Sequence, residues 1–280
     1  AAALVFGIVH SAEVGWGAAT TLLALTAGVL LLAAFVAGQA RAAQPLLPLR
    51  LFADRGRAGA YAARFLFNGV LVSFYFFMTQ YLQGVSDLTP LQAGLAFLPV
   101  TAAAFAAATL TSRLSRRLGN DLVAVAGVAA MLIGTAWASR VGPHTGYLAG
   151  IALPMLVFGI GQGFGLSALT TGAMAGVAAE DAGVAGGLVN VAHHLGGALG
   201  LGILVTVFDA SGGLGDTPHE LLAHRVSAAL TVAVAFLALA LAVTLLSRPR
   251  RGATAQGAHD LAPDLTAVDA DTHALARTAA

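Results

Sequence analysis

The chain has 280 residues, of which 58% are hydrophobic and only 10% are charged, and its mean hydropathy is +0.83. Soluble domains carry about 25% charged residues, so this composition excludes a soluble globular fold. The net charge of +1 gives no support for a polyanionic partner, and we expect no nucleic-acid binding. The absence of cysteine excludes disulfides, thiol catalysis and thiolate metal sites.

Seven apolar stretches are long enough to cross a lipid bilayer. A helix that spans roughly 30 Å of hydrocarbon needs about 20 apolar residues. The stretches run approximately over residues 20–37, 58–83, 91–111, 122–139, 147–169, 183–208 and 225–246. They are continuously apolar and lack the alternation of barrel strands, which indicates helices. The sequence therefore predicts an all-α, multi-pass membrane protein.

The stretches divide the chain into four parts. Residues 1–37 hold a short apolar piece, interpreted as the end of one helix, and the whole of a second helix. Residues 38–57 form a polar connector, and residues 58–246 form a predicted six-helix bundle. The polar, aperiodic segment over residues 247–280 is expected to be a disordered tail. Because the chain opens inside a helix without a methionine, we expect it to be a fragment of a longer protein.

Arginine placement predicts the orientation in the membrane, because cytoplasmic loops carry an excess of basic residues. Counting the spans in alternation places three arginine-rich segments on one side. These segments contain Arg41, Arg50, Arg55 and Arg57, then Arg113, Arg116 and Arg117, and finally Arg248, Arg250 and Arg251. The opposite loops hold almost no arginine, with Arg140 as the exception. We therefore predict a cytoplasmic C-terminus. The loop over residues 170–182 fits least well, since it carries Glu180 and Asp181 but no arginine.

Glycines inside the spans predict where helices approach one another closely. Small residues four apart line one helix face and let two backbones approach. The pairs with this spacing are Gly159 with Gly163, Gly161 with Gly165, Gly183 with Gly187, and Gly196 with Gly200. We expect all four pairs to pack against neighbouring helices.

Three regions carry longer motifs. They are FVAGQAR at residues 35–41 with PLLPLRLF at 45–52, FFMTQYLQGV at 76–85 with LTPLQAGLAFLP at 88–99, and GGLVN at 186–190 with LGGALG at 195–200. In this order they resemble the fourteen-span drug/proton antiporter branch of the major facilitator superfamily, in its C-terminal half. The resemblance implies that residues 1–37 belong to two extra central helices and that residues 58–246 are the second six-helix bundle.

The resemblance also implies partners and substrates. It implies a proton-coupled exporter in the cell membrane, with amphiphilic small molecules and protons as ligands and a first bundle, absent here, as the other half of the protein. This chain departs from the family at His193-His194, where relatives often carry Arg-Gln, and in the loop over residues 113–119, which only echoes the superfamily's cytoplasmic loop motif.

Polar residues within the span over residues 58–83 are candidates for the substrate cavity, since polar groups at membrane depth are costly and therefore often functional. Arg64 and Asn68 lie four residues apart on one helix face, and Tyr75 continues that stripe. The resemblance implies that this helix lines the cavity. An alternative for Arg64 is that it extends to lipid phosphates near the helix end.

Three further cavity candidates lie in later spans. Gln162 sits mid-span among glycines, and either a neighbouring helix or a water-filled cavity must take its hydrogen bonds. Asn190 and His194 share a helix face. A histidine at this depth could change charge near neutral pH and relay protons, or it could be purely structural, and His193 is the weaker candidate of the two histidines.

The sequence favours no enzymatic chemistry. Gly159 to Gly165 lack the third glycine and the preceding strand of a dinucleotide site, and no cofactor is expected. The adjacent histidines point to different helix faces and have no acidic partner, so we expect no metal. A secondary transporter is the leading hypothesis, and a non-transporting scaffold or inactive remnant is the alternative.

Overall fold

The computed structural model describes residues 17–41, 48–212 and 217–248, together with residues 3, 6, 7, 10 and 15. These residues form helices without a strand, which confirms the predicted all-α class. The α-helices are α2 (Ala19–Arg41), α3 (Arg55–Gly84), α4 (Pro90–Ala96), α5 (Leu98–Leu118), α6 (Asn120–Ala138), α7 (Leu153–Met174), α8 (Ala182–Ala210) and α9 (Pro218–Leu246). Short helical turns are η1 (Leu49–Phe52), η2 (Leu148–Ala152) and η3 (Ala179–Asp181). The predicted tail beyond residue 248 lies outside the described residues.

The seven predicted spans each correspond to a described helix of membrane-spanning length and composition. Two of these spans are interrupted next to a proline. α4 and α5 meet at Phe97, two residues before Pro99, and the π-type turn η2 ends just before Pro154. Proline has no backbone N–H and its ring crowds the carbonyl four residues earlier, so a regular helix cannot continue through it.

Capping residues set the helix starts and explain one shifted boundary. The last span was predicted to begin at residue 225, but α9 begins at Pro218. Thr217 accepts a hydrogen bond from the backbone N–H of Glu220, and the Glu220 carboxylate accepts one from the backbone N–H of Thr217. This capping box, with proline at the first helical position, starts the helix before its apolar run begins.

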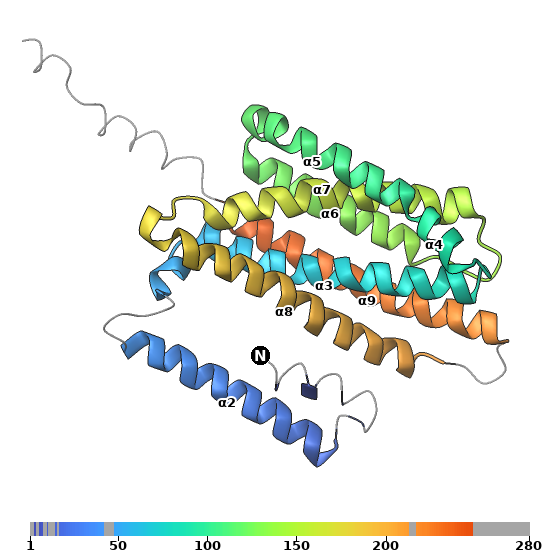
Figure 1. Cartoon of the computed structure of the whole chain (residues 1–280), viewed down its shortest axis with the longest axis horizontal. Coiled ribbons are helices and arrows are strands. Elements are labelled where there is room, and N and C mark those ends of the chain that lie inside the picture. The colour runs from blue at the N-terminus through green and yellow to red at the C-terminus, as the bar shows by residue number, and fades with distance from the viewer. Residues whose placement is uncertain are drawn as a thin grey trace, which may run out of the picture. The chain divides into compact units, whose positions relative to one another are not determined.

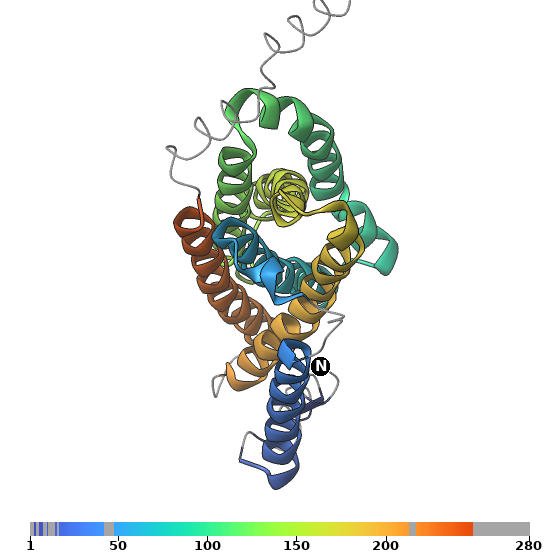
Figure 2. The ribbon, with the colours of Figure 1, turned by 90° about the vertical axis from the view of Figure 1, so that its left-hand side faces the viewer.

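The helices α3 to α9 pack into one antiparallel bundle (Figure 1). Seen end-on, α3 and α7 lie inside, and α5, α6, α9 and α8 lie around them (Figure 2). α7 packs along α5, α6 and α3, whereas α3 packs along α7, α8 and α9. α5 and α8 make few or no contacts with each other, so the ring of outer helices is not closed between these two helices.

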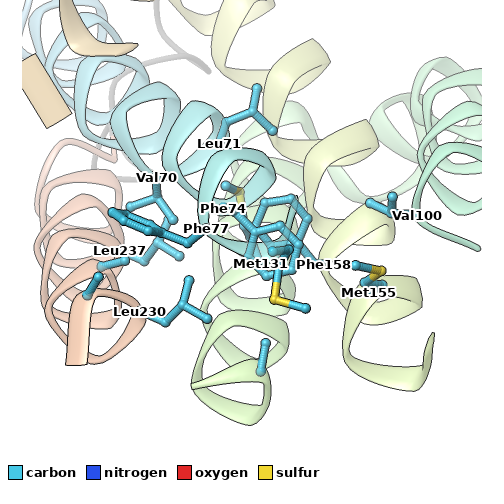
Figure 3. Packing of buried hydrophobic residues seen from close by; sticks show 14 of the residues in the cluster. Val70, Leu71, Phe74, Phe77, Val100, Met131, Met155, Phe158, Leu230 and Leu237 are labelled. Carbon is cyan, nitrogen blue, oxygen red and sulfur yellow. The ribbon is translucent and has the colours of Figure 1, made fainter. Parts of the chain in front are cut away.

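Aromatic side chains join the two inner helices. The rings of Phe74 on α3 and Phe158 on α7 stack at a centroid distance of 3.7 Å (Figure 3). Both side chains are fully buried, as are Phe77 and Met131 beside them. Leu230 from α9 belongs to the same core. The core residues come mainly from α3, α6, α7 and α9, with Val100 of α5 and Leu204 of α8 in the same cluster, so close apolar packing holds these helices together.

Glycines provide the close helix contacts on three of the four predicted faces. A Cβ atom at Gly159 or Gly163 would collide with the backbone of α5, and one at Gly161 with the backbone of α6. Gly165 packs against the Phe67 ring, where a Cβ atom would come within 2.6 Å of a ring carbon.

The glycines of α8 divide into a packed pair and an open pair. Cβ atoms at Gly196 and Gly200 would collide with the backbone of α3. Gly183 and Gly187 have nothing within 4 Å of the Cβ position. Nothing in the described bundle packs on that last pair, because α8 turns this face away from α3, and close packing there stays a prediction.

Described arginines of all three groups lie at one end of the bundle, as their alternation predicts. Arg248, after α9, donates a hydrogen bond of 3.4 Å to the backbone carbonyl of Asp121 at the start of α6. Arg50 in η1 bonds to Glu180 and Asp181 between α7 and α8. The acidic loop that lacked an arginine of its own is therefore neutralised by the arginine of a distant segment.

Candidate functional site

Gln162 lies on the part of α7 that faces the open side of the bundle. At about 100° per residue, its side chain lies about 60° from Gly159, which packs on α5, and about 60° in the other direction from Gly165, which packs on Phe67 of α3. The side chain is therefore directed between α5 and α3, and it is only partly buried.

Tyr75 on α3 is the hydrogen-bond partner of Gln162. The Tyr75 hydroxyl donates to the Gln162 Oε1 at 2.9 Å, which joins two predicted cavity residues from different helices. The Tyr75 ring contacts Phe97 at the α4–α5 break, with centroids 5.4 Å apart, and meets Phe158 edge-on. Gln162 thus has a helix partner in Tyr75 and still has exposed surface, and its place in a substrate cavity stays a prediction.

Arg64 is buried between α3 and α7, with 6% of its surface exposed. Its Nη1 donates to the backbone carbonyl of Leu166 at 3.0 Å and to the Thr170 hydroxyl at 2.5 Å. The alternative in which this side chain extends to lipid phosphates is therefore wrong. Thr170, which the sequence reading missed, is the residue that turns the arginine inward.

Asn68 joins α3 to α8. Its Nδ2 donates to the backbone carbonyl of His193 at 2.6 Å, and its side chain has no exposed surface. The Asn68 Oδ1 and the His193 Nδ1 are enclosed and have no hydrogen-bond partner among the described residues. The sequence favours His194 over its neighbour as the candidate for proton relay, yet His193 is the histidine whose Nδ1 lies in this buried polar layer.

Asn190 and His194 lie apart from the other cavity candidates. Both side chains are exposed on α8. At about 100° per residue they lie about 120° and 160° around the helix from Gly196, which packs on α3. They share this outward face with Gly183 and Gly187, which also have no close neighbour in the described bundle.

An ion pair outside the spans was missed by the sequence reading. Arg50 Nε donates to Asp181 Oδ2 at 3.1 Å, and Arg50 Nη2 donates to Asp181 Oδ1 and to Glu180 Oε1, each at 3.0 Å. The hydrogen bonds and charge of Asp181 raise the pKa of Arg50 above its usual value. The adjacent acids at the start of α8 were the available signal, since a partly buried Asp181 requires a cation.

Residues 1–201 match the family described as Major Facilitator Superfamily. The chain belongs to the Major Facilitator Superfamily. The match covers most of the chain, from α2 into α8, and therefore includes every predicted cavity residue. The fold agrees with this assignment, since the described part is a multi-pass helical membrane protein with seven spans.

Curated relatives within this superfamily carry the names of antibiotic exporters and resistance proteins. A cephamycin export protein of Amycolatopsis lactamdurans is 35% identical over 87% of this chain and 50% of its own length. A puromycin resistance protein of Streptomyces alboniger is 35% identical over 79% of this chain and 44% of its own length. A lincomycin resistance protein of Streptomyces lincolnensis is 34% identical over 81% of this chain. The chain thus spans about half the length of the curated relatives it matches.

Proposed function

We propose that this chain is the second half of a fourteen-span, proton-coupled exporter of amphiphilic small molecules in the cell membrane. The observation that carries the proposal is the Tyr75–Gln162 pair. It places polar and aromatic groups on the two inner helices, at the open side of a bundle of this superfamily. The names of the relatives support export of antibiotics as the activity.

A first bundle of the same protein is the partner that we propose for the open side and for the outward face of α8. In alternating access, two bundles rock against each other around a site near the membrane midplane. The exposed Gly183, Gly187, Asn190 and His194 give α8 a face of small and polar residues, which is costly in contact with lipid but suits close contact with another bundle. We propose that Asn190 and His194 lie along this contact.

The proposed orientation has the C-terminus in the cytoplasm. The described members of the three arginine groups lie at one end of the bundle, and loops rich in arginine are retained on the cytoplasmic side. Proton coupling would require a titratable group within the membrane. The described spans carry Asp or Glu only near their ends, so we propose that the coupling acid belongs to the first bundle.

Efflux of a fluorescent cationic dye tests the proposal. The full reading frame that encodes this chain is expressed in cells that lack their own exporters, and dye loss is followed with and without a protonophore. We expect dye loss that stops when the proton gradient collapses. Dye retention equal to that of empty cells, at a verified amount of protein in the membrane, would favour the alternative of a non-transporting scaffold.

A further inference from the structure

Arg64 has one half of its guanidinium bound and the other half unused. Nη1 is anchored to α7 through the Leu166 carbonyl and the Thr170 hydroxyl. Nε is enclosed and has no hydrogen-bond partner among the described residues. Nη2 likewise makes no hydrogen bond within the described part of the chain. The donors of Nε and Nη2 form one edge of the planar group, and this edge is the one that carboxylates bind with two parallel hydrogen bonds.

Arg50 shows the same edge when it is occupied. Its Nε and Nη2 donate to the two oxygens of Asp181 at 3.1 and 3.0 Å. Arg50 lies outside the spans, where water can replace a missing partner, whereas Arg64 lies inside one and is 6% exposed. The arginine that depends more on a counter-charge is therefore the one without it.

The described part of the chain offers no carboxylate to Arg64. Its acidic residues lie in loops or near helix ends, and none forms an ion pair with Arg64. They are Asp54, Asp87, Asp121, Glu180, Asp181, Asp209 and Glu220. A buried charge without a partner is costly in a protein interior and in a membrane. The counter-charge must therefore come from outside these residues.

We propose that the Nε–Nη2 edge of Arg64 binds a carboxylate of the transported molecule, so that amphiphiles bearing one carboxylate are substrates. This inference rests on the proposed export function. Nε is enclosed in the present conformation, so binding through both nitrogens requires a local movement of the groups that cover Arg64.

The test compares two dyes that differ only in the carboxylate. A rhodamine dye with a free benzoic acid and the methyl ester of that dye are loaded into cells that express the full-length protein. Arg64→Gln removes the charge and the fork, Arg64→Lys retains only the charge, and Arg113→Gln removes an exposed arginine at the end of α5. All efflux rates are normalised to the amount of protein in the membrane.

We expect Arg64→Gln to lower efflux of the acid about tenfold or more, since hydrogen bonds between charged groups are the strong ones. Arg64→Lys should lower it less, because an ammonium cannot bind both oxygens in the fork geometry. Efflux of the ester should change by less than about twofold in either variant, and Arg113→Gln should change neither dye.

Two results would overturn the proposal. Equal loss of acid and ester efflux in Arg64→Gln would mean that the carboxylate belongs to another segment of the protein or that Arg64 only packs. Unchanged efflux of both dyes would mean that the free edge binds nothing that is transported.

A binding measurement separates this inference from the proposed function. If the native protein exports neither dye, the export function fails. Fluorescence polarisation with the purified full-length protein then measures the affinities of acid and ester directly. Tighter binding of the acid that is lost in Arg64→Gln would support the carboxylate site, and equal affinities in the native protein and the variant would refute it.

Discussion

Asn68 on α3 donates a 2.6 Å hydrogen bond to the backbone carbonyl of His193 on α8. This bond lies beside the closest approach of the two helices, where Gly69 faces Gly196 and Gly200. A Cβ atom at Gly69 would come within 3.0 Å of the Gly196 carbonyl oxygen. The amide thus links the two helices at a place where their backbones touch, and its first effect is on packing.

We expect Asn68→Leu to destabilise the protein without changing its substrate preference. Replacing the amide removes an interhelical bond, which contributes about 0.6 kcal/mol on average and up to about 1.7 kcal/mol in membrane proteins. The measurement is thermal unfolding in detergent, together with a resistance profile over several chemically distinct antibiotics at equal protein amounts. A change in the ranking of antibiotics would instead mean that Asn68 contacts substrate.

Asn190→Ala is predicted to have the opposite effects: thermal stability should stay nearly unchanged, and the ranking of exported compounds should change. Asn190 is exposed and makes no hydrogen bond with the described residues, so its loss should shift thermal stability by less than about 0.5 kcal/mol. If α8 presents this face to a first bundle, the variant should change the ranking of exported compounds. An equal change in the export of all compounds would show that Asn190 does not lie at the proposed contact with substrate or partner.

The hydrogen bond between Tyr75 and Gln162 should appear as energetic coupling. Tyr75→Phe retains the ring against Phe97 and Phe158 but removes the hydroxyl that donates to Gln162. Together with Gln162→Leu and the double variant, it forms a cycle of unfolding free energies. We expect a coupling of about 0.6 kcal/mol, within the range measured for such bonds in membranes. Strictly additive effects would show that the bond contributes nothing to stability.

The spans could be predicted from the sequence because the apolar length of a helix is a local property, but the partners of the polar side chains could not. Gln162 and Tyr75 lie 87 residues apart, and only the packing of α7 on α3 brings them together. The orientation of α8 about its own axis could in principle have been predicted from the sequence. Once Gly196 and Gly200 are assigned to the face that contacts a neighbour, Asn190 and His194 must point away from it.

Gly196→Ala should destabilise the bundle strongly. The added Cβ would collide with the Phe65 carbonyl group, which is backbone and cannot rotate aside. Such overpacking costs typically about 1–3 kcal/mol, and we expect a corresponding drop in melting temperature and in folded protein.

Gly187→Ala is the matched control for this change. It makes the same substitution on the same helix, where nothing lies within 4 Å of the new atom. There alanine should be neutral or stabilising by up to about 1 kcal/mol, because it favours the helix over glycine. Equal losses in both variants would mean that Gly187 is closely packed as well, against the first bundle that we propose for this face of α8.

The proposed orientation predicts which loops can be labelled from outside the cell. These 280 residues contain no cysteine, so single cysteines at Asp87 and Arg116 are labelled without background from this part of the protein. Both residues are exposed, at opposite ends of the span formed by α4 and α5. A membrane-impermeant maleimide applied to intact cells should label Asp87→Cys and should label Arg116→Cys only after the cells are opened.

The physical basis is that Arg116 belongs to a group with Arg113 and Arg117, and such groups stay on the cytoplasmic side during insertion. Asp87 lies in a loop that contacts the α8–α9 side of the bundle, where its carboxylate is 3.8 Å from His219 Nε2. Arg140, in the next loop at that same end, opposes this orientation, and Arg140→Cys should be labelled from outside together with Asp87→Cys. Labelling of Arg116→Cys in intact cells, with Asp87→Cys protected, would invert the proteinʼs orientation and place the C-terminus outside.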